Sequence, residues 1–69
     1  EFEIEPGSAA DGHVVSDLHL PHSVLLGAVT RRDGSAEIVR GRTRLDAGDN
    51  VVVFSRPDAL AATRKAFSA

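Results

Sequence analysis

The first residues of the chain alternate between charged and apolar. Within Glu1–Glu5, Phe2 and Ile4 would point to one side of a strand and the three glutamates to the other. A period of two is typical of a strand with one buried face and one wet face. Because Pro6-Gly7 ends the pattern, we expect the strand to stop there.

A short helix is expected next. Val14, Val15 and Leu18 share one helical face, which is enough for a turn or two. Pro21 prevents the helix from continuing.

Two runs, Val24–Val29 and Val51–Phe54, are apolar at successive positions. This pattern is typical of central strands that are covered on both faces. Gly27 indicates either a bulge or the close approach of another backbone. The turn pair Asp33-Gly34 precedes an apolar return over residues 36–39, so we expect a hairpin over Val24–Val39.

Polar residues 40–44 are expected to form a connection, and Leu45–Asp49 a tight turn that leads into the next strand. A final helix is expected from the capping-box pattern of Ser55–Asp58, which has Pro57 in its first turn. Leu60, Thr63 and Phe67 lie on one face of this helix. The small residues that would allow close approach to a sheet are Ala59, Ala62 and Ala66.

This order of elements predicts a small α+β domain, β-α-β-β-β-α, in which a mixed or antiparallel sheet carries a packed C-terminal helix. At 69 residues, the chain has room for one core only. Because it contains no Met and begins inside a predicted strand, we interpret residues 1–69 as a domain excised from a longer protein.

Composition excludes several classes of function. The net charge of −2 argues against a strongly basic nucleic-acid binder. The absence of Cys excludes a disulfide scaffold, a thiol nucleophile and Cys-based zinc sites. No apolar run approaches the ~20 residues that span a bilayer.

Candidate chemistry is sparse. His19 and His22 are separated by Pro21 and lack the usual spacing of metal ligands, so no metal site is expected. Asp46 and Asp49 are better explained as turn residues than as a catalytic pair. No serine has a histidine and an acid placed around it, so we expect no catalytic residues and no enzyme.

A cluster of arginines lies in the predicted hairpin and the loop that follows it. It could bind a phosphate group or an acidic surface of a partner. Solvated strand ends are the more ordinary explanation, and self-association with the acidic first strand is a third. The arginines are Arg31, Arg32, Arg40, Arg42 and Arg44.

In order and spacing, several motifs resemble one family. Leu20-Pro21 precedes a strand that ends in Gly27–Arg31, and Asp33-Gly34 follows. Thr43–Phe54 contains a Leu-x-x-Gly-Asp turn that leads into an apolar strand, and Gly12 lies where a glycine enters the first helix. Together they resemble the C-terminal domain of RCK proteins (regulators of conductance of potassium), of the TrkA C-terminal type.

The resemblance implies a regulatory domain of a potassium or cation transport system, and it favours a Trk potassium-uptake subunit. It implies a homodimer located in the cytoplasm at the inner face of the membrane, together with a membrane transporter subunit. A Rossmann-like domain in the same chain would hold a nucleotide, and the domain itself would need no cofactor. In several members of the family a small ligand, often a cyclic dinucleotide, binds in the dimer cleft.

On this resemblance, the ligand-binding residues expected at the cleft are His22, Val24 and Leu25, with Arg31 as the nearest charge. One alternative is an accessory domain of a cation–proton antiporter or permease. An alternative of another class is a small nucleic-acid-binding module that uses Arg31–Arg44. We expect no nucleic-acid partner, because the net charge is negative and the first strand is acidic.

Overall fold

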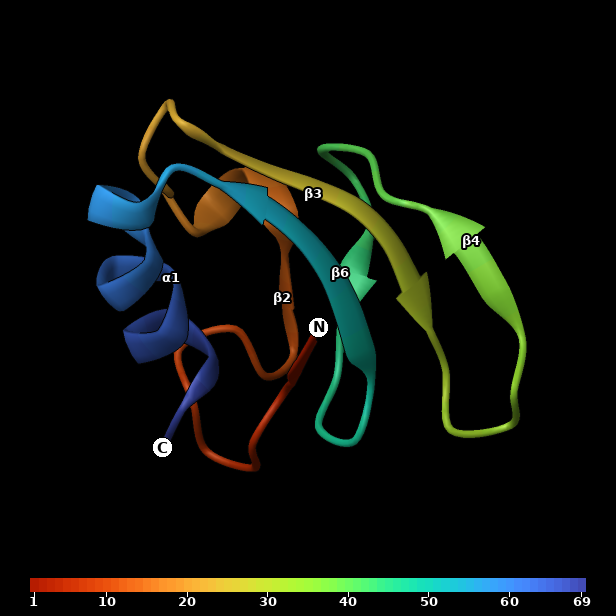
Figure 1. The fold of residues 1–69 in the computed structure, drawn as a ribbon. Helices are drawn as coiled ribbons and strands as arrows, with labels where there is room; N and C mark the ends of the chain where they lie inside the picture. Colours follow the sequence, from red (N-terminus) through yellow and green to blue (C-terminus); the bar gives the residue numbers. More distant parts are fainter.

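A computed structural model describes all residues, 1–69, and shows a four-stranded antiparallel sheet with one C-terminal helix (Figure 1). The predicted α+β class is therefore confirmed. The strand order is β1-β6-β3-β4. The bounds of these strands are β1 Phe2–Glu3, β6 Asn50–Ser55, β3 Val24–Thr30 and β4 Ala36–Ile38.

A second, two-stranded antiparallel sheet pairs β2 (His13–Val14) with β5 (Arg44–Leu45). The remaining elements are two 3₁₀ turns, η1 (Val15–Asp17) and η2 (Pro57–Ala59), and the helix α1 (Leu60–Phe67). Neither α1 nor any other helical segment is long and apolar enough to cross a bilayer.

The core lies between one face of the large sheet and the helix, with the N-terminal loops closing the remaining sides. Alternate residues of the strands supply it, as the period of two requires. The fully buried side chains of largest volume are Phe67, Ile4, Leu45, Val29, Val51 and Thr63.

The first segment is placed as its alternation predicts, although only two of its residues form a regular strand. Ile4 is fully buried and the glutamates around it are exposed. Phe2 packs edge-on against Phe67, with ring centroids 6.0 Å apart. The guanidinium of Arg64 lies 5.5 Å from the centre of the Phe2 ring. These contacts fix β1 to the C-terminal helix.

The short helix predicted around residues 14–18 is wrong in kind. The segment is a strand followed by a single 3₁₀ turn, because its backbone N–H groups donate to the segment that lies opposite and not within a helix. The N–H of Val15 donates to the carbonyl of Thr43 and that of Ser16 to Gly41. The polar connection expected at residues 40–44 therefore ends in a strand, β5. The polar residues of this segment do not indicate a strand.

The final helix is confirmed, but its predicted cap is wrong. The hydroxyl of Ser55 donates to the neighbouring carbonyl of Arg56, at 2.8 Å, and caps no helix N–H group. Pro57 instead starts the 3₁₀ turn η2, which leads into α1. Thr63 and Phe67 face the core as predicted, whereas Ala62 is exposed.

The end of α1 is closed by the N-terminal loop. The last helical carbonyls would otherwise lack partners. The N–H of Ala10 donates to the carbonyl of Ala66, and that of Glu5 to Phe67. Residues far apart in sequence therefore complete the helix.

The hairpin predicted over residues 24–39 is confirmed by antiparallel pairing of β3 with β4. Of the two alternatives for Gly27, the bulge is confirmed, and the group that comes close to this glycine is a side chain and not another backbone. The register between β3 and β6 shifts between Leu26 and Ala28, which marks a bulge. A Cβ added to Gly27 would lie only 2.9 Å from Cε2 of Phe54, so the Phe54 ring lies across this glycine.

Candidate functional site

The outer face of the large sheet is apolar and uncovered. Leu25 and Phe54 are direct cross-strand partners, and their side chains are 64% and 60% exposed. Ile38, on the edge strand β4, is 66% exposed. The expectation that these strands are covered on both faces is therefore wrong for the single chain, because α1 covers only the opposite face.

These exposed residues belong to one continuous surface. Ala28 pairs with Val52 on one side and with Ile38 on the other, so the three form a row across the sheet. Leu25 and Phe54 form the next row. We call these five residues the outer patch. It contains no charged side chain.

The structure places the four predicted ligand-binding residues at two ends of one strand. His22, which is exposed, Val24 and Leu25 lie at the start of β3, beside the end of β6. Val24 packs against the core, whereas Leu25 is part of the outer patch. Arg31 follows the other end of β3, about 20 Å from Leu25 at the rise of an extended strand. It is not brought together with the other three.

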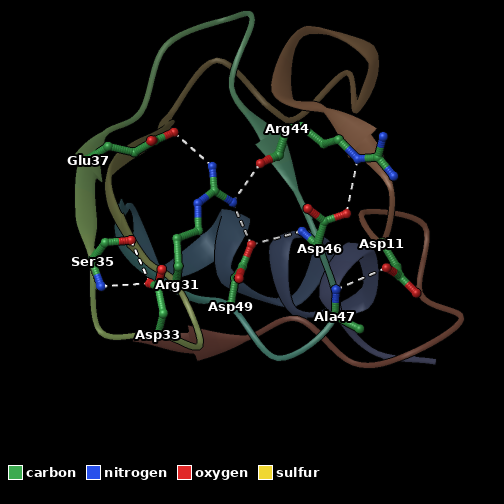
Figure 2. Close-up of polar contacts among 9 residues, drawn as sticks. All are labelled: Asp11, Arg31, Asp33, Ser35, Glu37, Arg44, Asp46, Ala47 and Asp49. Carbon is green, nitrogen blue, oxygen red and sulfur yellow. Dashed lines mark hydrogen bonds and ion pairs between the residues drawn. The ribbon is translucent and has the colours of Figure 1, made fainter.

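Arg31 is held by groups of its own chain (Figure 2). Its Nη1 donates to Oδ2 of Asp49 at 2.6 Å and to the carbonyl of Arg44 at 2.8 Å. Its Nη2 donates to Oε1 of Glu37 at 2.7 Å. Burial lowers the pKa of Arg31, but the hydrogen bonds and charges of Asp49 and Glu37 outweigh it, so this pKa is raised above the ordinary value of arginine. These contacts join the end of β3 to β4 and to the turn before β6.

The two aspartates of that turn act as turn residues, as predicted. Asp49 is only 3% exposed, and its Oδ2 also accepts the N–H of Asp46 at 2.9 Å. Asp46 in turn accepts a hydrogen bond from Nε of Arg44 at 3.0 Å. Gly48 has a φ of +90°, a conformation that favours glycine.

Comparison with known proteins identifies the family. The model of the family described as the TrkA-C domain matches residues 1–68. The chain belongs to this family. A relative in Archaeoglobus fulgidus, the "Trk system potassium uptake protein TrkA homolog", is 41% identical over 58 residues. The match covers 84% of this chain and 13% of the relative, so the chain spans only a small part of that protein's length.

The arginine cluster of this TrkA-C domain divides into two groups. Arg31 and Arg44 form ion pairs with carboxylates of the chain. The other three, Arg32, Arg40 and Arg42, are exposed and form no ion pair. Only these three guanidinium groups are free to meet a partner.

A third aspartate of the TrkA-C domain has a role that its sequence context did not indicate. Asp11 accepts the N–H of Gly7 at 3.1 Å through Oδ2 and that of Ala47 at 3.0 Å through Oδ1. These two hydrogen bonds, the first above all, lower the pKa of Asp11. No sequence signal links residues 11 and 47, because the contact depends on the folding of both loops.

Two observations concern ligands. No three His, Asp or Glu side chains are grouped so that they could hold a metal ion. The surface of the single TrkA-C domain also contains no pocket. A ligand site at the outer patch would therefore need a second surface to enclose it.

Proposed function

We propose that this TrkA-C domain is a regulatory and dimerisation module of a potassium-transport protein and has no catalytic activity of its own. The family match and the name of the archaeal relative support the connection with potassium uptake. The observation that carries the proposal is the outer patch, an uncovered apolar sheet face centred on the Leu25–Phe54 pair.

A second copy of the domain is the occupant that best fits this patch. In a two-fold dimer, the same surface faces itself, so a charge near the symmetry axis would meet its own copy. The outer patch contains none. Its aromatic and branched side chains are the kind that stabilise interface centres, and a 69-residue chain gains more from further burial than a large domain does.

The dimer would regulate by changing its arrangement. A small ligand bound between the copies, near His22 and Leu25, would favour one arrangement by its difference in affinity for the two. The change would pass to a neighbouring Rossmann-like nucleotide-binding domain and from there to a membrane transporter subunit, at the cytoplasmic side.

The reading frame upstream of Glu1 tests this wider assembly. A strand followed by Gly-x-Gly-x-x-Gly and a helix would support a regulator with its own nucleotide-binding domain. Several apolar stretches of ~20 residues would instead place the domain in a transporter, such as an antiporter or permease.

Variants of the outer patch test the interface. Phe54→Ser and Leu25→Ser remove exposed apolar area without opening the core, so the domain should stay folded by circular dichroism. We expect each to weaken the dimer at least about tenfold, the equivalent of ~1.4 kcal/mol, in sedimentation equilibrium. Ala62→Ser, on the exposed side of α1, is the control. Equal dimerisation by all four proteins would contradict the proposal.

A further inference from the structure

Strand β4 forms an open edge of the sheet, on the side away from α1 (Figure 1). The N–H of Val39 donates to the carbonyl of Gly27, which sets the alternation of the ladder. Glu37 therefore directs its backbone groups to β3, and those of Ala36 and Ile38 point away from the sheet. All three residues of β4 are exposed. The edge thus offers donors and acceptors to one more strand.

Two free arginines of the domain, Arg40 and Arg42, follow β4 along the chain, and both are exposed. Neither forms an ion pair within the chain. Arg32, in the turn before β4, has its side chain against Gly48, in the turn that leads into β6 on the other side of β3. A strand that added to β4 would therefore pass close to uncompensated positive charge at the end where Arg40 and Arg42 lie.

The acidic groups of the same hairpin are already engaged. Glu37 forms its ion pair with Arg31. Asp33 accepts hydrogen bonds from both the N–H and the hydroxyl of Ser35, at 2.9 and 2.7 Å. The charge of Glu37 is matched by Arg31, whereas Asp33 accepts only neutral donors and stays charged in the turn before β4. The excess positive charge along the edge therefore lies after β4, at Arg40 and Arg42, even though the whole chain carries −2.

We propose that the β4 edge binds an extended acidic segment of a partner protein by strand addition. The backbone of the segment pairs with Ala36 and Ile38, and its carboxylates meet Arg40 and Arg42. Charge complementarity favours such a segment over a neutral or basic one. The dimerisation proposed above uses the face of the sheet, whereas this site uses its edge; Ile38 contributes its side chain to the outer patch and its backbone to the edge.

Because β4 is short, backbone pairing alone would bind a segment only weakly, and charge attraction is needed as well. Three residues offer only a few backbone hydrogen bonds, and each adds a modest net free energy. The arginines supply the rest, through exposed pairs that salt screens. Binding is therefore weak and decreases as ionic strength rises.

Two labelled octapeptides test the proposal by fluorescence anisotropy with the whole chain. In one, glutamate alternates with valine; in the other, lysine replaces glutamate. We expect only the acidic peptide to bind. The double variant Arg40→Gln/Arg42→Gln should weaken it by about threefold for each charge removed. Lys65→Gln, which removes one charge from the exposed side of α1, should leave binding unchanged.

A second variant tests the backbone pairing. Ala36→Pro removes an N–H that points to the open edge and leaves the pairing with β3 intact, since proline is tolerated at such edge positions. It should abolish binding, whereas Ala36→Ser should not. Equal binding of both peptides, or full binding by Ala36→Pro, would overturn the proposal. So would concentration-dependent self-association that Ala36→Pro removes, because the edge would then be occupied by a second copy.

Discussion

Arg31 and Asp49 form the shortest ion pair of the domain, with 2.6 Å between Nη1 and Oδ2. The pair connects the end of β3 to the turn before β6, and its aspartate is almost fully buried. Arg31 belongs to a cluster for which the sequence leaves anion binding open, although solvated strand ends are the more ordinary explanation. In the fold, this guanidinium has a structural role, because it bonds to groups of its own chain.

Removal of either partner of this pair should destabilise the domain. Asp49→Asn removes the buried counter-charge of Arg31 and leaves only the exposed Glu37. We expect a loss of about 2 kcal/mol, below the roughly 3–5 kcal/mol typical of fully buried pairs. Urea unfolding measures the difference. Arg44→Gln, which breaks an exposed pair with Asp46, should cost less than about 1 kcal/mol. Equal losses in the two variants would contradict the structural role of Arg31.

Stability should decrease in acid through Asp11 and Asp33. Hydrogen bonds from Gly7 and Ala47 lower the pKa of Asp11, and those from Ser35 lower the pKa of Asp33, below the ordinary value of 3.8. A carboxylate with a lowered folded-state pKa contributes stability above its unfolded-state pKa, and loses that contribution as pH falls through the folded-state value.

The urea midpoint should therefore fall between about pH 5 and pH 2, and less steeply in Asp11→Asn than in the parent chain. Asp17→Asn is the control, because the Asp17 carboxylate accepts no hydrogen bond in the fold. Parallel pH curves for all three proteins would show that the contacts of Asp11 do not stabilise the folded state.

Gly27→Ala should alter the outer patch with little effect on the core. The added Cβ meets the Phe54 ring, which is exposed and free to turn aside. We expect unfolding free energy to change by less than about 1 kcal/mol while dimerisation weakens. Sedimentation and urea unfolding together separate the two effects. If this variant dimerised as strongly as the parent chain, the Phe54 ring would not be part of the interface.

His19 occupies a left-handed conformation, with a φ of +51°. A side chain with a Cβ costs roughly 1–2 kcal/mol there, and glycine relieves this cost but gains entropy when unfolded. We therefore expect His19→Gly to be neutral or to stabilise by up to about 1 kcal/mol. His22→Gly, at an exposed position with no positive φ, should destabilise or do nothing. A marked loss in His19→Gly alone would indicate that the imidazole makes a needed contact.

Much of the fold could be predicted from local patterns. The alternation around Phe2 and Ile4, the apolar runs of β3 and β6, and the helical spacing of Thr63 and Phe67 each follow from which side chains must be buried. The predictions that were wrong concern elements that depend on long-range pairing. The strand at Arg44–Leu45 exists because β2 lies opposite it, and its polar sequence carries no such signal.

The candidate site could be predicted only in part. Apolar runs indicate that both faces of a strand are apolar, but they do not show which face its own chain leaves uncovered. Leu25 was expected at a cleft and lies on the uncovered face, whereas Phe54 was assigned to the core. The role of Arg31 could not be predicted either, since it depends on Asp49, eighteen residues away in sequence.

The mass of the chain in solution tests the central claim most directly. Sedimentation equilibrium of the unmodified domain at micromolar concentration should give about twice 7.3 kDa. Because the outer patch has no charge, this mass should persist at high salt, where charged interfaces dissociate. A strict monomer up to millimolar concentration would contradict dimerisation through the face that Leu25 and Phe54 share.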